Sequence, residues 1–354
     1  MNVSPAAEPG ARNASFEIGG TSVPPGRRAV VDVPISNLSN HTPMTMPVQV
    51  VNGRRTGPRL FVCAALHGDE INGVEIIRRL LRDPDIGSIH GTLLAVPIVN
   101  VFGFVAGSRY LPDRRDLNRS FPGSAKGSLA GRLAHVFINE ILVRCTHGVD
   151  LHTAVIHRDN LPQIRANIDD ARNLEMARCF GAPVVVNAGE RDGSLRQEAA
   201  KRNIPVIVYE GGEALRFQDS VIRVGVRGVR RVMRNIGMLR TKPLSRPTPE
   251  PLIARSSSWV RAPGGGILRS EVVLGDHVEV GERLGVVADP FGENEAMVTA
   301  STRGIVIGRT NLPVVNAGDA LFHIVDTAGT QAAALSLEAF DLNYQAAEDR
   351  LMFD

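Results

Sequence analysis

Short apolar runs alternate with stretches of helical periodicity between about residues 46 and 240. The runs are rich in Val, Ile and Leu, the composition of strands that are buried on both faces of a sheet. They cover residues 59–66, 92–99, 148–152, 183–187 and 205–209. The periodic stretches between them predict helices at 72–82, 129–144, 171–180 and 194–202. Alternating strands and helices favour an α/β domain with a largely parallel sheet.

The chain on either side of this region has a different composition. Residues 1–45 are rich in Pro, Gly, Asn and Ser and predict an N-terminal extension with short strands. The α/β domain is assigned to residues 46–250, and four prolines between 243 and 251 mark a linker or domain boundary within 241–258. Residues 256–328 are rich in Gly and short apolar runs, the pattern of a small all-β module. Residues 329–354 form a C-terminal tail with a helix predicted near 336–352.

Charge and cysteine content exclude several classes of protein. The formal net charge of the 354 residues is only +3, and no block of like charges provides a nucleic-acid footprint. The three cysteines, Cys63, Cys145 and Cys179, are too far apart for a disulfide framework and fit a reducing compartment. The N-terminus has no apolar signal core, and no apolar stretch is long enough for a membrane span. A cytoplasmic protein without nucleic-acid or membrane partners is therefore expected.

The strongest chemical signal is HGDE at 67–70, directly after an apolar run. His67 and Glu70, three residues apart, can face one metal ion from a single turn at the end of a strand. DLHT at 150–153 follows another apolar run and makes His152 the natural third ligand, with His147 and His157 as substitutes. Two imidazoles and a carboxylate are typical of a catalytic zinc site, which keeps one coordination position open.

A second motif, DLNR, occupies residues 116–119. Asn118 and Arg119 suit a substrate carboxylate, because the guanidinium fork matches two carboxylate oxygens. Asp116 is a candidate for orienting a metal-bound imidazole from behind. Arg109, just upstream, is a candidate for polarising a carbonyl or steadying an oxyanion. A turn with a surface ion pair explains DLNR equally well when it is taken alone.

The third motif, YEGGE at 209–213, follows the run that ends near residue 208. Glu210 falls at a strand end, where a carboxylate beside a metal can act as a base. The two following glycines allow the backbone to turn sharply. Glu213 is the competing candidate for the same role.

Taken in order, HGDE, DLNR, DLHT and YEGGE resemble the succinylglutamate desuccinylase/aspartoacylase family, which is related to the zinc carboxypeptidases. The resemblance spans about residues 50–240. It implies an α/β/α sandwich around a mixed sheet, and one zinc ion per chain held by His67, Glu70 and His152.

The same resemblance implies a role for the remaining motif residues. Glu210 acts as general base and then as general acid, and Arg109 lies near the scissile carbonyl. Asn118 and Arg119 grip a substrate carboxylate. The expected activity is therefore a zinc-dependent deacylase that cleaves the amide bond of an N-acylated amino acid or similar small carboxylate-bearing substrate.

Other functions stay open from the sequence alone. One is a carboxypeptidase-like peptidase, which needs a wide cleft. Another is a catalytically silent zinc- or anion-binding protein. A purely structural metal site would need a fourth protein ligand, such as Asp69 or Asp150.

The C-terminal β module resembles the barrel-sandwich domains that end many family members, and also biotinyl and lipoyl carrier domains. Carriers attach their cofactor to a lysine, but the three lysines of this chain, Lys126, Lys201 and Lys242, all precede the module. Covalent biotin or lipoate is therefore excluded. The module is expected to cover the active site or to mediate assembly, and a homo-oligomer stays open.

Overall fold

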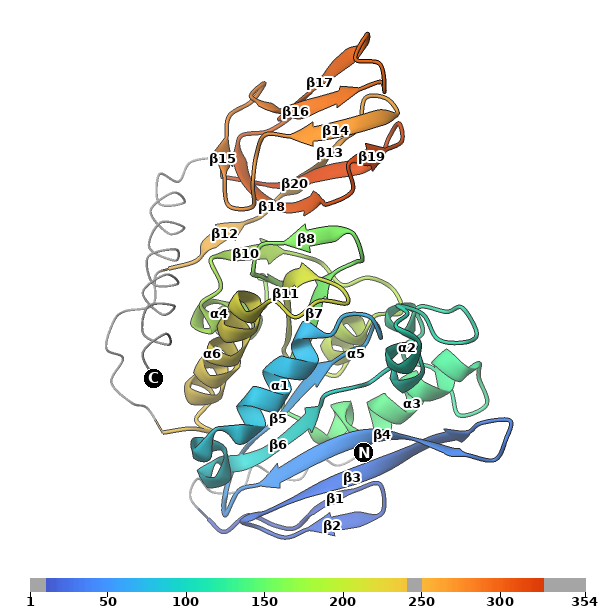
Figure 1. Ribbon diagram of the computed structural model, residues 1–354. Coiled ribbons are helices and arrows are strands. Elements are labelled where there is room, and N and C mark those ends of the chain that lie inside the picture. Colours follow the sequence, from blue (N-terminus) through green and yellow to red (C-terminus); the bar gives the residue numbers. More distant parts are fainter. Residues whose placement is uncertain (1–10, 241–249, 328–354) are drawn as a thin grey trace, which may run out of the picture.

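The computed structural model describes residues 11–240 and 250–327, and a nine-stranded mixed sheet forms its centre (Figure 1). The strands of this sheet are β3 (Arg27–Asn37), β4 (Pro43–Asn52), β5 (Arg55–Ala64), β6 (His90–Val96), β7 (His147–Ala154), β9 (Gln163–Ala166), β10 (Val184–Asn187), β11 (Val206–Glu213) and β12 (Leu252–Ala254). They follow the order β12-β10-β9-β11-β7-β5-β6-β4-β3. The pairs β3/β4, β4/β6 and β9/β11 are antiparallel, and the other pairs are parallel.

Helices cover both faces of the sheet. One apolar core contains residues of α1 (Asn72–Arg82), α4 (Ala171–Phe180) and α6 (Asp219–Asn235), and the other contains residues of α3 (Leu129–Glu140) and α5 (Leu195–Lys201). The strands contribute side chains to both cores, since successive side chains alternate between the two faces of a sheet. In β5, Leu60 and Val62 belong to the first core, whereas Phe61 and Cys63 belong to the second. These layers confirm the α/β/α sandwich. None of the described helices is long and apolar enough to cross a membrane.

Most of the longer elements were predictable. α1 and α4 have the predicted bounds, and the five apolar runs correspond to β5, β6, β7, β10 and β11. The helix predicted at 129–144 is divided, because α3 ends at Glu140 and a 3₁₀ turn, η3 (Leu142–Arg144), follows. Several short elements were missed, because they are too short to show a period. These are α2 (Val101–Ala106), β8 (Arg158–Asn160), β9, and the 3₁₀ turns η1 (Pro84–Ser88) and η2 (Leu117–Arg119).

The N-terminal extension differs from the expectation of short strands. β1 (Phe16–Ile18) and β2 (Thr21–Val23) are short, but β3 has eleven residues and pairs with β4 at the edge of the main sheet. Val31 and Val33 are buried, whereas alternate residues of the strand are exposed. Pro34 is tolerated because β3 is an edge strand and the register shifts after it. The Pro- and Gly-rich composition hid this period-two pattern.

The C-terminal module consists of two small sheets with a core of their own. The strands are β13 (Ser257–Arg261), β14 (Gly266–Ser270), β15 (His277–Val278), β16 (Arg283–Ala288), β17 (Glu295–Thr299), β18 (Gly304–Thr310), β19 (Val314–Val315) and β20 (Ala320–Asp326). One sheet has the order β13-β20-β18-β15 and the other β17-β16-β14-β19.

The module is joined to the α/β domain by strand pairing and by apolar contacts. β18 pairs with β8, and Ile305 and Val325 pack against Val184 and Leu252 of the main sheet. Within the predicted linker, Leu252–Ala254 forms β12 and extends the main sheet beside β10. Residues 241–249 and the predicted helix at 336–352 lie outside the described residues.

Candidate active site

Three neighbouring strands of the main sheet bring the predicted motifs to one edge. β5, β7 and β11 are adjacent and parallel, so their carboxyl ends lie side by side. His67 and Glu70 follow β5, His152 lies near the end of β7, and Glu210 lies in β11. Ligands of open α/β sheets bind at this edge.

The loop after β5 has a constrained backbone. Ala65 adopts a left-handed conformation with φ of +49°, which is uncommon for a residue with a side chain. A Cβ atom on Gly68 would lie 2.0 Å from the carbonyl carbon of Gly103. Only glycine therefore allows the loop that carries His67 and Glu70 to pack this closely against α2.

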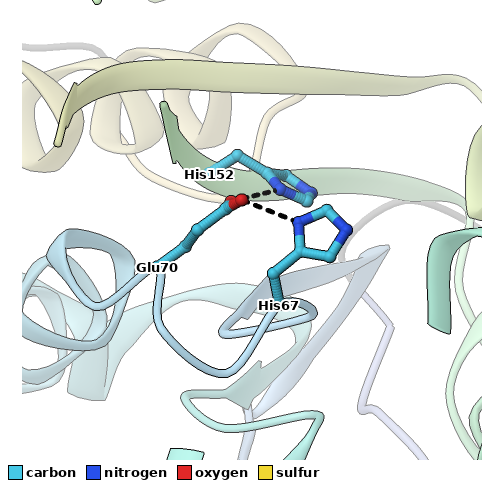
Figure 2. Close-up of side chains that lie close together, drawn as sticks. All are labelled: His67, Glu70 and His152. Atoms are coloured by element: carbon cyan, nitrogen blue, oxygen red, sulfur yellow. Dashed lines mark hydrogen bonds and ion pairs between the residues drawn. The ribbon is translucent and has the colours of Figure 1, made fainter. Parts of the chain in front are cut away.

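His67, Glu70 and His152 form a compact, buried cluster (Figure 2). Nδ1 of His67 lies 2.8 Å from Oε1 of Glu70, and Nδ1 of His152 lies 2.7 Å from Oε2. One ligand atom from each residue lies within 4.8 Å of those of the other two. Both imidazoles thus turn the same ring nitrogen towards one carboxylate.

A further carboxylate lies behind each ring. Nε2 of His67 is 3.1 Å from Oδ1 of Asp116, and Nε2 of His152 is 2.8 Å from Oδ2 of Asp150. The Cys63 thiol donates to the other oxygen of Asp150 at 3.2 Å. Such carboxylates fix the orientation of the ring and increase the basicity of Nδ1, the nitrogen that faces the cluster. Asp150 therefore supports His152 from behind instead of joining the cluster as a fourth ligand.

The cluster is electrostatically coupled. Burial acts to raise the pKa of Glu70, but the two imidazoles outweigh burial and hold that pKa well below its usual range. Burial acts to lower the pKa of His67, but the charge of Glu70 and a hydrogen bond with Asp116 raise it overall. The pKa of His152 is likewise raised, against burial, by Asp150 and Glu70. The carboxylate and the two imidazoles therefore shift one another's pKa values in opposite directions.

A cavity of about 340 Å³ opens over the cluster, and Arg109 lies in its wall. Nη1 of Arg109 donates to Oε1 of Glu70 at 2.9 Å, and Nη2 donates to Oδ2 of Asp116 at 3.1 Å. The Asn100 side chain, which caps α2, donates to the carbonyl oxygen of Arg109 at 3.3 Å. A guanidinium carries five N–H groups, so Arg109 keeps donors for a ligand oxygen beyond these two contacts.

Asn118 and Arg119 lie in η2 and also line the cavity. Asp116 caps this turn, because Oδ1 accepts a hydrogen bond from the Asn118 amide at 2.8 Å. The side-chain oxygen of Asn118 accepts from the backbone N–H of Leu195 at 3.0 Å. The side-chain nitrogen Nδ2 of Asn118 is therefore the group that this residue can offer to a ligand.

Glu210 reaches the cavity from β11. Both of its carboxylate oxygens lie 3.3 Å from Nη1 of Arg165, and Oε2 accepts from Nδ2 of Asn160 at 3.1 Å. These contacts fix the carboxylate from the side of β8 and β9.

Glu213, the competing candidate base, is not among the residues that line this cavity. The register of β11 against β7 shifts between Glu210 and Glu213, and Gly212 has φ of +76°. Glu213 accepts hydrogen bonds from the backbone N–H of His157 at 2.9 Å and from Nδ2 of Asn311 at 3.0 Å. Its carboxylate therefore fastens loops together outside the cavity.

Comparison with known proteins identifies the family of the chain. A family model described as the succinylglutamate desuccinylase/aspartoacylase catalytic domain matches residues 56–236. The chain is 30% identical over 310 residues to the N-alpha-acetyl-L-2,4-diaminobutyric acid deacetylase of Halomonas elongata. The aligned region covers 83% of this chain and 90% of that protein. The chain belongs to the succinylglutamate desuccinylase/aspartoacylase family.

Solved structures share the fold. The product-bound structure of the ectoine utilization protein EutE (DoeB) from Ruegeria pomeroyi superimposes with a TM-score of 0.76 at 23% identity, over 85% of this chain and 95% of that one. A succinylglutamate desuccinylase/aspartoacylase from Rhodobacter sphaeroides gives a TM-score of 0.75 at 25% identity, over 84% and 95%. The shared region includes more than the matched catalytic domain.

The cavity of this family member contains residues that the motifs did not indicate. Its wall carries six arginines but only two glutamates. Beyond Arg109 and Arg119, the arginines are Arg158, Arg165, Arg191 and Arg196. Arg158 and Arg165 come from the short strands β8 and β9, Arg191 from a loop and Arg196 from α5. The one available signal was the density of arginine in the segments that follow the strand candidates.

The two substitute histidines do not join the cluster. His147 begins β7 and contacts the hydroxyl of Thr146 at 2.8 Å, and His157 follows the end of the same strand. Across residues 11–240 and 250–327, His67, Glu70 and His152 are the one group of His, Cys, Asp and Glu side chains arranged to hold a metal.

Proposed function

We propose that the chain is a zinc-dependent hydrolase that cleaves the amide bond of an N-acylated amino acid or a similar small carboxylate-bearing substrate. The observation that carries this proposal is that the cluster and Glu210 line the same cavity from adjacent strands. Family membership and the similarity to the deacetylase from Halomonas elongata support the proposal that the bond cleaved joins an acyl group to nitrogen.

The donor set fits zinc. Two imidazole nitrogens and one carboxylate oxygen are typical of catalytic zinc sites, in which three protein ligands leave a position for the reaction. The carboxylates behind His67 and His152 supply the support that such ligands require. When bound, zinc supplies Lewis acidity, which polarises a carbonyl group and lowers the pKa of water.

The residues of the chain then have distinct tasks. Glu210 accepts a proton from the attacking water and delivers it to the leaving nitrogen. Arg109 donates hydrogen bonds to the carbonyl oxygen as negative charge develops there. Asn118 and Arg119 bind the substrate carboxylate and thereby orient the scissile bond.

The size of the cavity favours small substrates over peptides. A volume of about 340 Å³ lies at the lower end of the range for small-molecule sites. Trp259 of the C-terminal module forms part of the wall, so the module narrows the space that an extended peptide needs. A panel of N-acylated amino acids and C-terminally free dipeptides, incubated with zinc and assayed for free amine, tests this choice. Faster release from the dipeptides would contradict the proposal.

Replacing Asp116 by Asn is expected to weaken zinc binding by roughly 10- to 100-fold. The substitution removes the charge behind His67 but keeps the size of the side chain that caps η2. Competition with a chelator measures the affinity. Asp113→Asn is the matched control in the same loop, because Asp113 contacts the Ala130 amide instead of the cluster. Equal affinities of the two variants would speak against a role for Asp116.

Zinc affinity is expected to fall as the pH is lowered from about 8 to about 6. The pKa values of His67 and His152 are raised above 6.5, so protons compete with zinc over a range that extends above the usual histidine titration. Calorimetry in buffers of different ionisation enthalpy should detect protons released on binding. An affinity that does not change with pH would contradict this reading of the two imidazoles.

A further inference from the structure

A groove of about 470 Å³ lies over α4 and shares no wall residue with the candidate active site. One face of α4 lines it, through Ala171, Leu174, Glu175, Arg178 and Cys179. Glu250 and Pro251, just before β12, complete the wall. Leu174 and Cys179 also pack against the core of the α/β domain, so the wall of this α4 groove is partly apolar.

Three arginines of α6 lie beside the α4 groove. Arg227, Arg231 and Arg234 recur at intervals of four and three residues, so this arginine row follows one side of α6. Arg231 donates to the carbonyl oxygen of Phe180 in α4 at 3.4 Å, and the two helices pack side by side (Figure 1). Burial and the charges of Arg227 and Arg234 lower the pKa of Arg231. Positive charge thus gathers next to the groove.

Acidic side chains of the groove itself do not neutralise this row. Glu175 accepts a hydrogen bond from Nδ2 of Asn235 at 3.1 Å, and Glu250 lies 4.0 Å from Nε of Arg178. Among the described residues, no carboxylate forms an ion pair with Arg231 or Arg234. An acidic occupant of the groove is therefore favoured.

The described part of the chain ends close to this groove. The backbone N–H of Asp326 donates to the carbonyl oxygen of Ser256 at 3.1 Å. Ser256 lies five residues after Pro251, which is at most about 18 Å of extended chain. Residues 328–335 can span about 26–29 Å when extended, so the residues after them can reach the groove.

Residues 336–352, which lie outside the described residues, have the sequence of an amphipathic helix. Five residues recur at intervals of three and four and form an apolar stripe on such a helix: Leu337, Phe340, Tyr344, Ala347 and Leu351. Three acids each follow a stripe residue directly and form an acidic edge along one side of it: Glu338, Asp341 and Glu348. A helix of this length spans about 25 Å, and α6 has the same number of residues, 17.

We propose that the α4 groove is the docking surface for residues 336–352 of the same chain, bound as an amphipathic helix. The apolar stripe lies over Leu174, Cys179 and Pro251, and the acidic edge faces the arginine row. Burial of apolar side chains and complementary charge both favour this occupant. The docked helix ties the end of the C-terminal module back to the α/β domain.

The thiol of Cys179 reports on docking, because the other two cysteines of the chain are buried. The rate of its modification by a methanethiosulfonate reagent is measured in the full-length protein. Phe340→Asp places a charge in the apolar stripe and should raise this rate by roughly 10-fold or more, because the groove is uncovered more often. Leu342→Asp places the same charge on the opposite side of the helix and should leave the rate unchanged. No increase with Phe340→Asp, or an equal increase with both variants, would overturn the proposal.

Charge reversal separates recognition from damage to the fold. Arg231→Glu combined with Arg234→Glu should raise the rate of Cys179 modification, because two acids then face the acidic edge. Changing the three acids of the edge to lysine in the same protein should restore slow modification, a rescue that misfolding does not produce. Failure of this rescue would overturn the placement of the acidic edge against the arginine row.

Disulfide cross-linking identifies which chain supplies the helix. A disulfide to Cys179 requires Cα atoms within about 7 Å, so only cysteines introduced in the apolar stripe should form it. Phe340→Cys and Tyr344→Cys are tested under mild oxidation, with Leu342→Cys as the control. A cross-link within one chain for a stripe position, and none for the control, is expected. A covalent dimer would assign the groove to a second copy and overturn the proposal, as would the absence of any cross-link from the five stripe positions.

Discussion

Glu210→Gln is expected to lower kcat by roughly 10²- to 10⁴-fold, the usual contribution of a general acid–base residue, while leaving the zinc content unchanged. Glutamine keeps the size of the side chain, and an oxygen in the place of Oε2 can still accept from Asn160 and Arg165, but the side chain cannot accept the proton. Steady-state kinetics on an N-acylated amino acid, together with metal analysis of the same preparation, measure both quantities. A loss in kcat with little change in KM is the expected signature.

Glu213→Gln is the control for this experiment. Glu213 lies three residues further along the same strand but bonds to the His157 amide and Asn311 outside the cavity wall. Its replacement should change thermal stability more than turnover. If Glu213→Gln abolished turnover and Glu210→Gln did not, the assignment of the base would be wrong.

His152→Ala is expected to remove most of the bound zinc and to lower activity by roughly 10³-fold or more, since several kcal/mol of transition-state stabilisation depend on the metal. The substitution takes one of the three proposed ligands from the cluster and leaves Glu70 and Asp150 without the imidazole that lies between them. Metal analysis after dialysis gives the zinc content, and a thermal melt shows whether the fold is retained.

His147→Ala is the matched control on the same strand. His147 lies at the start of β7 and contacts Thr146, away from the cluster. This variant should keep its zinc and its activity. Full zinc occupancy in His152→Ala, or loss of zinc in His147→Ala, would show that His152 is not the third ligand.

Hydrophobic periodicity was sufficient to predict the longer elements of the fold. α1 and α4 were recovered to the residue, because each has a clear apolar face against the sheet. β3 and β12 were not predicted, because prolines or glycines are frequent around them in the sequence. Both strands lie at an edge of the sheet. Edge strands tolerate these residues, so composition is a poor guide there.

The site was predictable where the chemistry lies on a strand end. The three-residue spacing of His67 and Glu70 and the position of His152 indicated their proximity, and the structure brings all three together. Their roles as ligands, and that of Glu210 as base, stay predictions. The sequence offered Asp150 as a fourth ligand only for a purely structural metal site, and its place behind His152 depends on ring orientation, which sequence does not give.

The remaining cavity residues depend on tertiary pairing. Arg158 and Trp259 are about a hundred positions apart in the sequence, and they meet only because β8 pairs with a strand of the C-terminal module. Neither residue belongs to a motif or to a periodic segment. Their proximity therefore could not be inferred before the register of β8 and β18 was known.

The central claim is that two distant segments hold one zinc ion and leave it a free coordination position beside Glu210. Crystals of the zinc-loaded protein, measured on both sides of the zinc absorption edge, test this claim most directly. The account predicts one anomalous peak per chain, bounded by His67, Glu70 and His152, with a non-protein ligand on the side of Glu210. A peak elsewhere, or one enclosed by four protein ligands, would contradict it.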